Sequence, residues 1–165
     1  MKHHPAHGQL TNYGSTTASS PSQLPYPILY AGDFEIGKEE HARILLDLWK
    51  DFDVNTLDKG AHVFADEVTM EFCDGSSVTK SRDDFMAYMQ EQRNSVSSFE
   101  STIDAVVSLK PKGKEESWAC VWGKQTSITP DNKKQQVYIN ENWMFDKEGK
   151  VSYIKQFNAV INNPS

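Results

Sequence analysis

The spacing of apolar residues along the chain switches between a helical period and a strand-like period. Over residues 37–52 apolar side chains recur every three or four positions, which predicts an amphipathic helix. A shorter helix is expected near residues 57–61. Val68, Met70 and Phe72 then alternate with polar residues, which predicts a half-buried strand.

A second long helix is predicted to begin at Ser81, because Ser81 and Asp84 have the spacing of a capping box. From residue 99 onward the period is two, and strands are expected over residues 99–109, 118–129, 137–145 and 151–161. We expect one face of the first of these strands to carry Phe99, Ser101, Ile103, Ala105, Val107 and Leu109. Helices followed by a long antiparallel meander predict an α+β fold, with the sheet curled over the helices.

Residues 1–33 differ in composition from the rest and are predicted to be a flexible leader, tag or linker. This stretch holds four of the seven prolines and a Ser- and Thr-rich run over residues 15–22. His3, His4 and His7 fit an expression tag or, alternatively, a native metal-binding tract. No secretory signal is recognisable. Residues 34–165 are expected to form a single domain.

Composition and charge argue against several classes of protein. The formal charge of −6 argues against a nucleic-acid partner, and no apolar run approaches the ~20 residues of a membrane span. Cys73 and Cys120 do not make a disulfide framework. No cluster has the spacing of zinc ligands and no glycine-rich phosphate loop is present, so we expect neither a metal nor a cofactor.

Three stretches of the chain resemble the nuclear transport factor 2-like superfamily, which has a cystatin-like fold. They are Phe-Ala-Asp-Glu-Val-Thr-Met-Glu at residues 64–71, Lys-Ser-Arg-Asp-Asp-Phe at 80–85, and the closing hairpin at 143–151. Relatives include SnoaL-like polyketide cyclases, ketosteroid isomerase and limonene epoxide hydrolase. The resemblance implies a cone-shaped half-barrel whose concave face encloses an apolar pocket, and a homodimer. It does not imply one activity, since this scaffold hosts many chemistries.

Glu141 is the candidate catalytic residue. It stands in a row of otherwise apolar positions, with Val137, Ile139, Trp143 and Phe145. Burial there would raise the pKa of its carboxyl group and suit it to act as a general base or as a protonated hydrogen-bond donor. The resemblance places Glu141 where ketosteroid isomerase keeps a buried acidic donor, a known example of this effect. The alternatives are an ion pair with Lys124 or Arg43, or a bulge that turns Glu141 to solvent.

The sequence departs from ketosteroid isomerase at two other positions. By the resemblance, Phe72 occupies the place of the catalytic base and Leu48 the place of a phenol, so ketosteroid isomerisation is not expected. An arginine flanked by two carboxylates, as epoxide opening would require, is not evident either. Arg43, Arg82 and Arg93 all fall on predicted helices.

The remaining pocket candidates follow from strand pairing and from aromatic content. A tight final hairpin would place Glu141 opposite Ile154, with Gln156 and Asn158 on the same face and Trp122 on the neighbouring strand. The predicted pocket residues are Trp49, Phe72, Tyr88, Met89, Trp122, Trp143, Gln156 and Asn158. The alternatives are that the aromatic residues simply fill a core and that the amides satisfy backbone groups.

Val151, Tyr153 and Phe157 are expected on the opposite face of the last strand, with Lys155 among them. An apolar outer row of this kind is typical of an association surface, so we expect a homodimer through the outer face of the C-terminal sheet. Two functions stay open. One is a SnoaL-like enzyme that applies acid/base chemistry (isomerase, cyclase or hydrolase type) to a small apolar, carbonyl-bearing molecule. The other is a non-enzymatic ligand-binding or dimerisation module.

Overall fold

The computed structural model describes residues 25–162 and contains two α-helices, a 3-10 helix and one seven-stranded sheet. In chain order the elements are β1 (Phe34–Ile36), α1 (Glu39–Val54), η1 (Leu57–Val63), β2 (Phe64–Phe72), β3 (Ser77–Ser81), α2 (Arg82–Asn94), β4 (Ser98–Pro111), β5 (Ser117–Ile128), β6 (Lys134–Phe145) and β7 (Val151–Val160). The predicted α+β class is confirmed.

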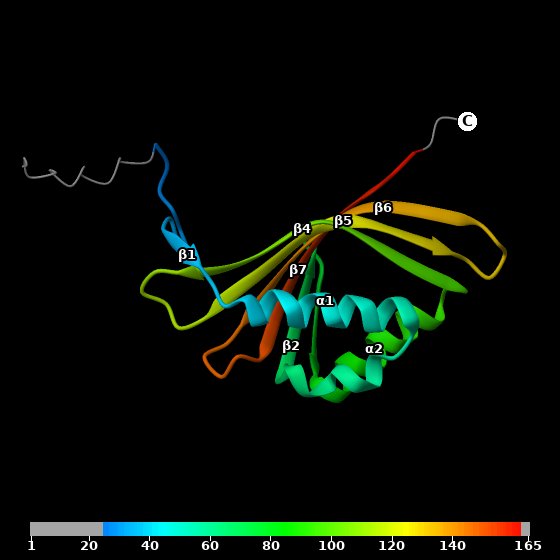
Figure 1. The fold of residues 1–165 in the computed structure, drawn as a ribbon, viewed down its shortest axis with the longest axis horizontal. Helices are drawn as coiled ribbons and strands as arrows, with labels where there is room; N and C mark the ends of the chain where they lie inside the picture. Colours follow the sequence, from blue (N-terminus) through cyan, green and yellow to red (C-terminus); the bar gives the residue numbers. More distant parts are fainter. Residues whose placement is uncertain (1–24, 163–165) are drawn as a thin grey trace, which may run out of the picture.

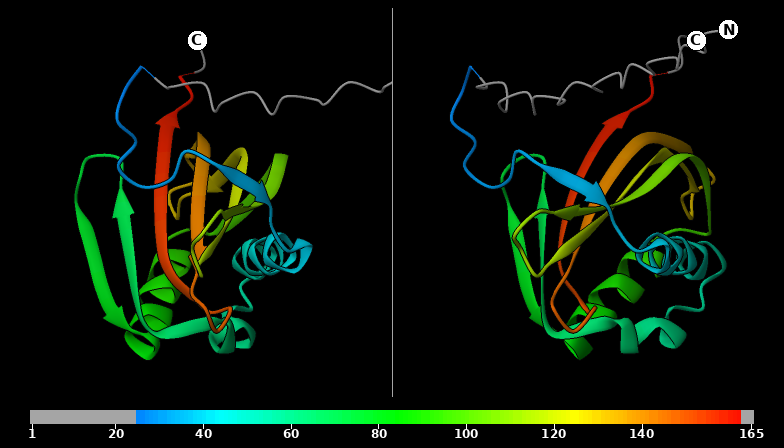
Figure 2. Two further views of the ribbon diagram at one scale, coloured as in Figure 1. Left: turned by 90° about the vertical axis from the view of Figure 1, so that its left-hand side faces the viewer. Right: turned by 60° about the vertical axis from the view of Figure 1, so that its left-hand side comes forward.

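The sheet bends over α1, and α2 lies below it beside β2 (Figure 1). The strand order is β1-β4-β5-β6-β7-β2-β3, and neighbouring strands are antiparallel except for the parallel pair β2 and β7. In Figure 2 the long strands are curved, and α1 lies on their concave side. The parallel pair and the short edge strand β1 were not part of the predicted meander.

The two α-helices turn one apolar side toward the sheet. Leu45, Leu48 and Trp49 of α1 are buried, as the helical period predicted. The predicted capping box is present at α2, where Ser81 Oγ accepts a hydrogen bond from the backbone N–H of Asp84. In the folded chain α1 packs against β4 and β5, and α2 packs against β2 and β3.

The prediction that β4 keeps one face from end to end is wrong, because the strand contains a bulge at Asp104. Ile103 pairs with Gly123 and Ala105 pairs with Trp122, so Asp104 is an extra residue and the facing of the later residues is reversed. The backbone of β4 also approaches Gly123 closely, since a Cβ atom there would lie 2.3 Å from the carbonyl oxygen of Thr102.

A second bulge, at Ser152, changes the register of the final hairpin. Val151 pairs with Phe145 and Tyr153 pairs with Met144, so Val151 is fully buried instead of lying on the outer row. The turn before β7 is also longer than predicted. Together they move the pairing by two residues, and Glu141 faces Gln156 rather than Ile154. A shift of two preserves facing, so Gln156 and Asn158 still point inward.

Most of the predicted leader lies outside the described residues. Its described part, residues 25–33, contacts β5 and the turn before it through Tyr30. The Tyr30 hydroxyl donates a hydrogen bond to Glu116 Oε1 (2.7 Å) and accepts one from Trp118 Nε1 (2.9 Å). The single-domain boundary at residue 34 stays a prediction. Neither helix in the described range is long and apolar enough to cross a membrane.

Candidate functional site

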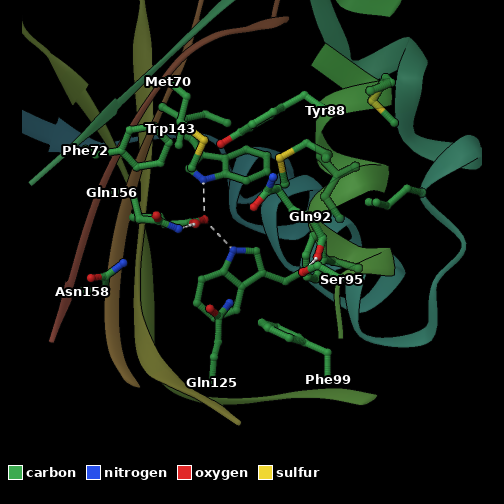
Figure 3. Close-up of a pocket in the computed structure, with 18 of the residues that line it drawn as sticks. Met70, Phe72, Tyr88, Gln92, Ser95, Phe99, Gln125, Trp143, Gln156 and Asn158 are labelled. Atoms are coloured by element: carbon green, nitrogen blue, oxygen red, sulfur yellow. Dashed lines mark hydrogen bonds between the residues drawn. The ribbon is translucent and has the colours of Figure 1, made fainter. Parts of the chain in front are cut away.

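A cavity of about 410 Å³ lies between the inner face of the sheet and the helices α1, η1 and α2. Its walls are mainly apolar and aromatic. The polar side chains that line it are those of Tyr88, Gln92, Ser95, Gln125, Gln135, Glu141, Gln156 and Asn158. Figure 3 shows Trp143, Gln156 and Tyr88 around the centre, with Gln125 and Phe99 at one side. The size and the few polar groups are typical of a small-molecule site.

Glu141 is the buried carboxyl group of this cavity, with an exposed fraction of 6%. It lies on β6 between Ile139 and Trp143, and all three point inward because they occupy alternate positions of a regular strand. Its cross-strand neighbours are Val121 on β5 and Gln156 on β7. The alternative in which a bulge turns Glu141 to solvent is therefore wrong.

Three neutral N–H groups bind the Glu141 carboxyl group. Oε2 accepts hydrogen bonds from Trp49 Nε1 (2.7 Å) and Trp143 Nε1 (2.8 Å), while Oε1 accepts one from Gln156 Nε2 (2.9 Å). The dashed lines of Figure 3 show these bonds converging on one carboxyl group. The donors come from α1, β6 and β7, so the site forms only when the helix is docked on the sheet.

Burial raises the pKa of the Glu141 carboxyl group above its ordinary value, because the charged form loses its hydration. The three hydrogen bonds oppose this by stabilising the carboxylate, and the effect of burial is the larger one. Neither cation considered as an ion-pair partner binds Glu141: Arg43 pairs with Glu39 on an exposed face of α1, and no ion pair joins Lys124 to Glu141 in the described chain. A carboxyl group with a raised pKa keeps its proton to higher pH than an ordinary glutamate, which suits it to donate or accept a proton.

The structure brings seven of the eight predicted pocket residues into the cavity. These are Trp49, Phe72, Tyr88, Met89, Trp143, Gln156 and Asn158. Trp122 is the exception. It is 43% exposed and lines a shallow groove on the outer face of the sheet, because it pairs with Asn140 while the residue opposite Glu141 is Val121. Trp118 lies on the same face of β5 as Trp122. It packs against the rings of Tyr30 and Tyr153 and does not line the cavity.

Several polar lining residues were not predicted. Gln92 lies four positions after Tyr88 and three after Met89, and Ser95, the C-cap residue of α2, lies three after Gln92. Helical spacing alone could therefore have put both on the same side of α2. Gln125 and Gln135 come from the far ends of β5 and β6, and only the curvature of the sheet brings them to the cavity.

The arginines considered for epoxide chemistry do not reach the cavity. Arg82 binds Asp66 and the carbonyl oxygen of Phe64, and Arg93 donates to three backbone carbonyl groups. Within residues 25–162 there is also no group of three His, Cys, Asp or Glu side chains that could hold a metal ion. The chemistry available in the described cavity is therefore that of one carboxyl group, one phenol, one serine hydroxyl and several amides.

No protein-family model matches the chain, and no curated protein sequence does. Solved structures do match. An epoxide hydrolase of the LEH-like type from Mycobacterium tuberculosis is 12% identical, with a TM-score of 0.59 over 73% of this chain and 83% of that one. An NTF2-like protein from Exiguobacterium is 13% identical, with a TM-score of 0.55 over 73% and 99% of the two chains. A SnoaL-like polyketide cyclase candidate from Shewanella denitrificans is 9% identical, with a TM-score of 0.59 over 74% and 92%.

The chain therefore has the nuclear transport factor 2-like fold, as the three sequence stretches predicted. At these identities the likeness concerns the architecture. What the protein does has to be argued from its own cavity.

Proposed function

We propose that the cavity binds a small, uncharged, apolar molecule carrying a carbonyl group, and that Glu141 handles a proton at that carbonyl. The observation that carries this proposal is one buried carboxyl group, held by three N–H donors, in a cavity of about 410 Å³ with apolar walls. An anionic ligand is disfavoured, because none of the described lining residues is a cation that could balance it.

The protonated carboxyl group would donate a hydrogen bond to the ligand carbonyl, which makes the neighbouring C–H groups more acidic. The ionised carboxyl group could instead remove such a proton and return it to the same carbon or to another one. In the first case Glu141 keeps its proton, and water has to accept the C–H proton and later return one to carbon. In the second case one proton moves from carbon to a carboxyl oxygen and back, so no second reactant is needed. This is chemistry of the isomerase or cyclase type.

Binding can be tested with cyclodecanone and cyclodecane, two rings of equal size of which only one has a carbonyl group. Quenching of tryptophan fluorescence should report both, since Trp49 and Trp143 line the cavity. We expect cyclodecanone to bind more tightly than cyclodecane at low pH, and this advantage to fade as pH rises through the pKa of Glu141. Glu141→Gln should bind the ketone without that pH dependence.

The matched control is Glu71→Gln. Glu71 lies on β2, outside the cavity, where Lys155 and Tyr153 bind its carboxylate. This variant should keep the pH dependence of the wild type. Equal binding of ring ketone and hydrocarbon at every pH would contradict the proposal.

A non-enzymatic binding module is the second candidate, favoured by the absence of another carboxyl or imidazole group among the described lining residues. Exchange of cyclodecanone C–H groups next to the carbonyl for deuterium, followed by NMR in D₂O, separates the two. An enzyme should accelerate the exchange and lose the acceleration in Glu141→Gln. A binding module should bind the ketone without accelerating its exchange.

We also propose that a second copy of the chain covers the outer face of the sheet. Trp122, Tyr138 and Phe157 are 43%, 59% and 42% exposed there, and all three line one shallow groove. Sedimentation equilibrium should give a dimer for the wild type and a monomer for Tyr138→Lys. A wild type that is monomeric at every concentration would contradict the dimer and leave the cavity proposal untouched.

A further inference from the structure

The two oxygen atoms of the Glu141 carboxyl group have different partners. Both donors to Oε2 are indole N–H groups, from Trp49 and Trp143, at 2.7 and 2.8 Å. An indole N–H can donate a hydrogen bond but cannot accept one, and a carboxyl oxygen offers about two lone pairs. Both acceptor positions of Oε2 are thus taken by groups that could not accept a proton from it.

Oε1 has a partner of another kind. Gln156 Nε2 donates to it at 2.9 Å, from the residue directly opposite Glu141 on β7. A glutamine side chain carries both a donor and an acceptor, so a half-turn of its amide group presents an oxygen in place of the NH₂ group. Gln156 can therefore stay bound to Oε1 whether that oxygen is ionised or carries a hydrogen atom, which neither tryptophan could do at Oε2.

We propose that Gln156 is the positioning residue of the site, and that Glu141 holds and transfers its proton at Oε1 alone, beside the Gln156 amide. Oε2 serves as the fixed anchor to α1 and β6. The part of this inference that concerns transfer to a ligand rests on the proposed function; the part that concerns where the proton resides does not.

The surroundings of Glu141 isolate this pair electrostatically. Of the described residues that line the cavity from α1, η1, α2, β2, β4, β5, β6 and β7, the other titratable side chain is Tyr88. Burial raises the pKa of its phenol, which keeps Tyr88 neutral in the range where a carboxyl group titrates. Arg93, the buried cation of α2, is bound to the backbone carbonyl groups of Phe52, Asp53 and Val96. The amide of Gln156 is thus the group that donates a hydrogen bond directly to Oε1.

The test is the pH midpoint of Glu141 itself, measured by NMR of ¹³C-labelled glutamate carboxyl groups and assigned with Glu141→Gln. Gln156→Leu removes the donor to Oε1 at similar side-chain volume. The hydrogen bond from Gln156 to the charged carboxylate is stronger than the one it makes to the protonated form, by roughly 1 kcal/mol or more, so its loss should raise the midpoint by about one pH unit. Gln156→Met is a second variant of the same kind, should the leucine variant not fold.

Asn158→Leu is the matched control. Asn158 lies two residues further along β7, on the same face, and lines the same cavity, while Glu141 takes its hydrogen bonds from other residues. This variant should leave the midpoint of Glu141 within about 0.3 pH units of the wild type, because it removes no donor to the carboxyl group. If both substitutions shift the pH midpoint of Glu141 by similar amounts, the cause is a general disturbance of the cavity, and that result would overturn the proposal.

Cyclodecanone binding separates this inference from the proposed function. If the ketone binds, the pH at which its affinity declines should move upward in Gln156→Leu together with the NMR midpoint. If the ketone does not bind but the midpoint moves, the proposed function fails and the positioning role of Gln156 stands. If Gln156→Leu folds and leaves the midpoint of Glu141 unchanged, the positioning role of Gln156 is wrong whatever the ligand does.

Discussion

Replacing Phe85 by alanine is expected to lower the free energy of unfolding by about 3–5 kcal/mol. Phe85 is fully buried on α2, and its ring packs against those of Phe64 and Tyr88 at centroid distances of 5.2 and 6.3 Å. The truncation removes buried apolar area and leaves a void between α2 and β2, which close-packed neighbours fill only in part. Urea unfolding followed by far-ultraviolet circular dichroism measures the change.

Phe34→Ala is the comparison for this substitution. Phe34 is 40% exposed on the short edge strand β1, so its loss should cost about 1 kcal/mol or less. Equal losses in the two variants would mean that α2 is not packed on the sheet as described. Because α2 also carries Tyr88, Met89 and Gln92 into the cavity, Phe85→Ala should weaken cyclodecanone binding as well.

Glu141 is expected to make the folded state less stable as pH rises above about 4.5, the ordinary pKa of a glutamate. Burial raises its pKa in the folded state, so between about 4.5 and the raised value the folded chain binds more protons than the unfolded chain. The free energy of unfolding therefore falls with increasing pH across this window, with a slope approaching about 1.4 kcal/mol per pH unit. Above the raised pKa the loss is complete and the slope ends.

The difference between wild type and Glu141→Gln isolates this contribution, since other groups titrate equally in both. Unfolding by urea at a series of pH values should show the wild type losing stability relative to the variant as pH rises. The glutamine oxygen can still accept the two indole hydrogen bonds, which keeps the packing comparable. A difference that stays constant with pH, or one that grows in favour of the wild type, would contradict a raised pKa for Glu141.

The position of Glu141 shows how far a sequence pattern can reach. A regular strand of period two has only two faces, so its place between Ile139 and Trp143 was enough to predict that it points into the core. The partners of its carboxyl group were less accessible. Trp49 lies 92 residues earlier in the chain, and its bond to Glu141 depends on how α1 docks in the curved sheet.

Trp122 shows where strand arithmetic fails. Its facing follows from the register of β5 against β6, in which Val121 pairs with Glu141 and Trp122 pairs with Asn140, and the period of either strand alone does not fix that register. In β7 the bulge at Ser152 combined with a longer turn moved the pairing by two residues, and the predicted facing of Gln156 and Asn158 survived because an even shift preserves parity.

Periodicity and short-range hydrogen bonds were enough to predict the two α-helices, the four long C-terminal strands, the cap of α2 and the inward carboxyl group. Tertiary structure decided the parallel pairing of β2 with β7, the two bulges and the three donors around Glu141. These features form only when segments far apart in the sequence pack against one another. A local sequence pattern cannot predict them, because it carries no information about which distant residues come into contact.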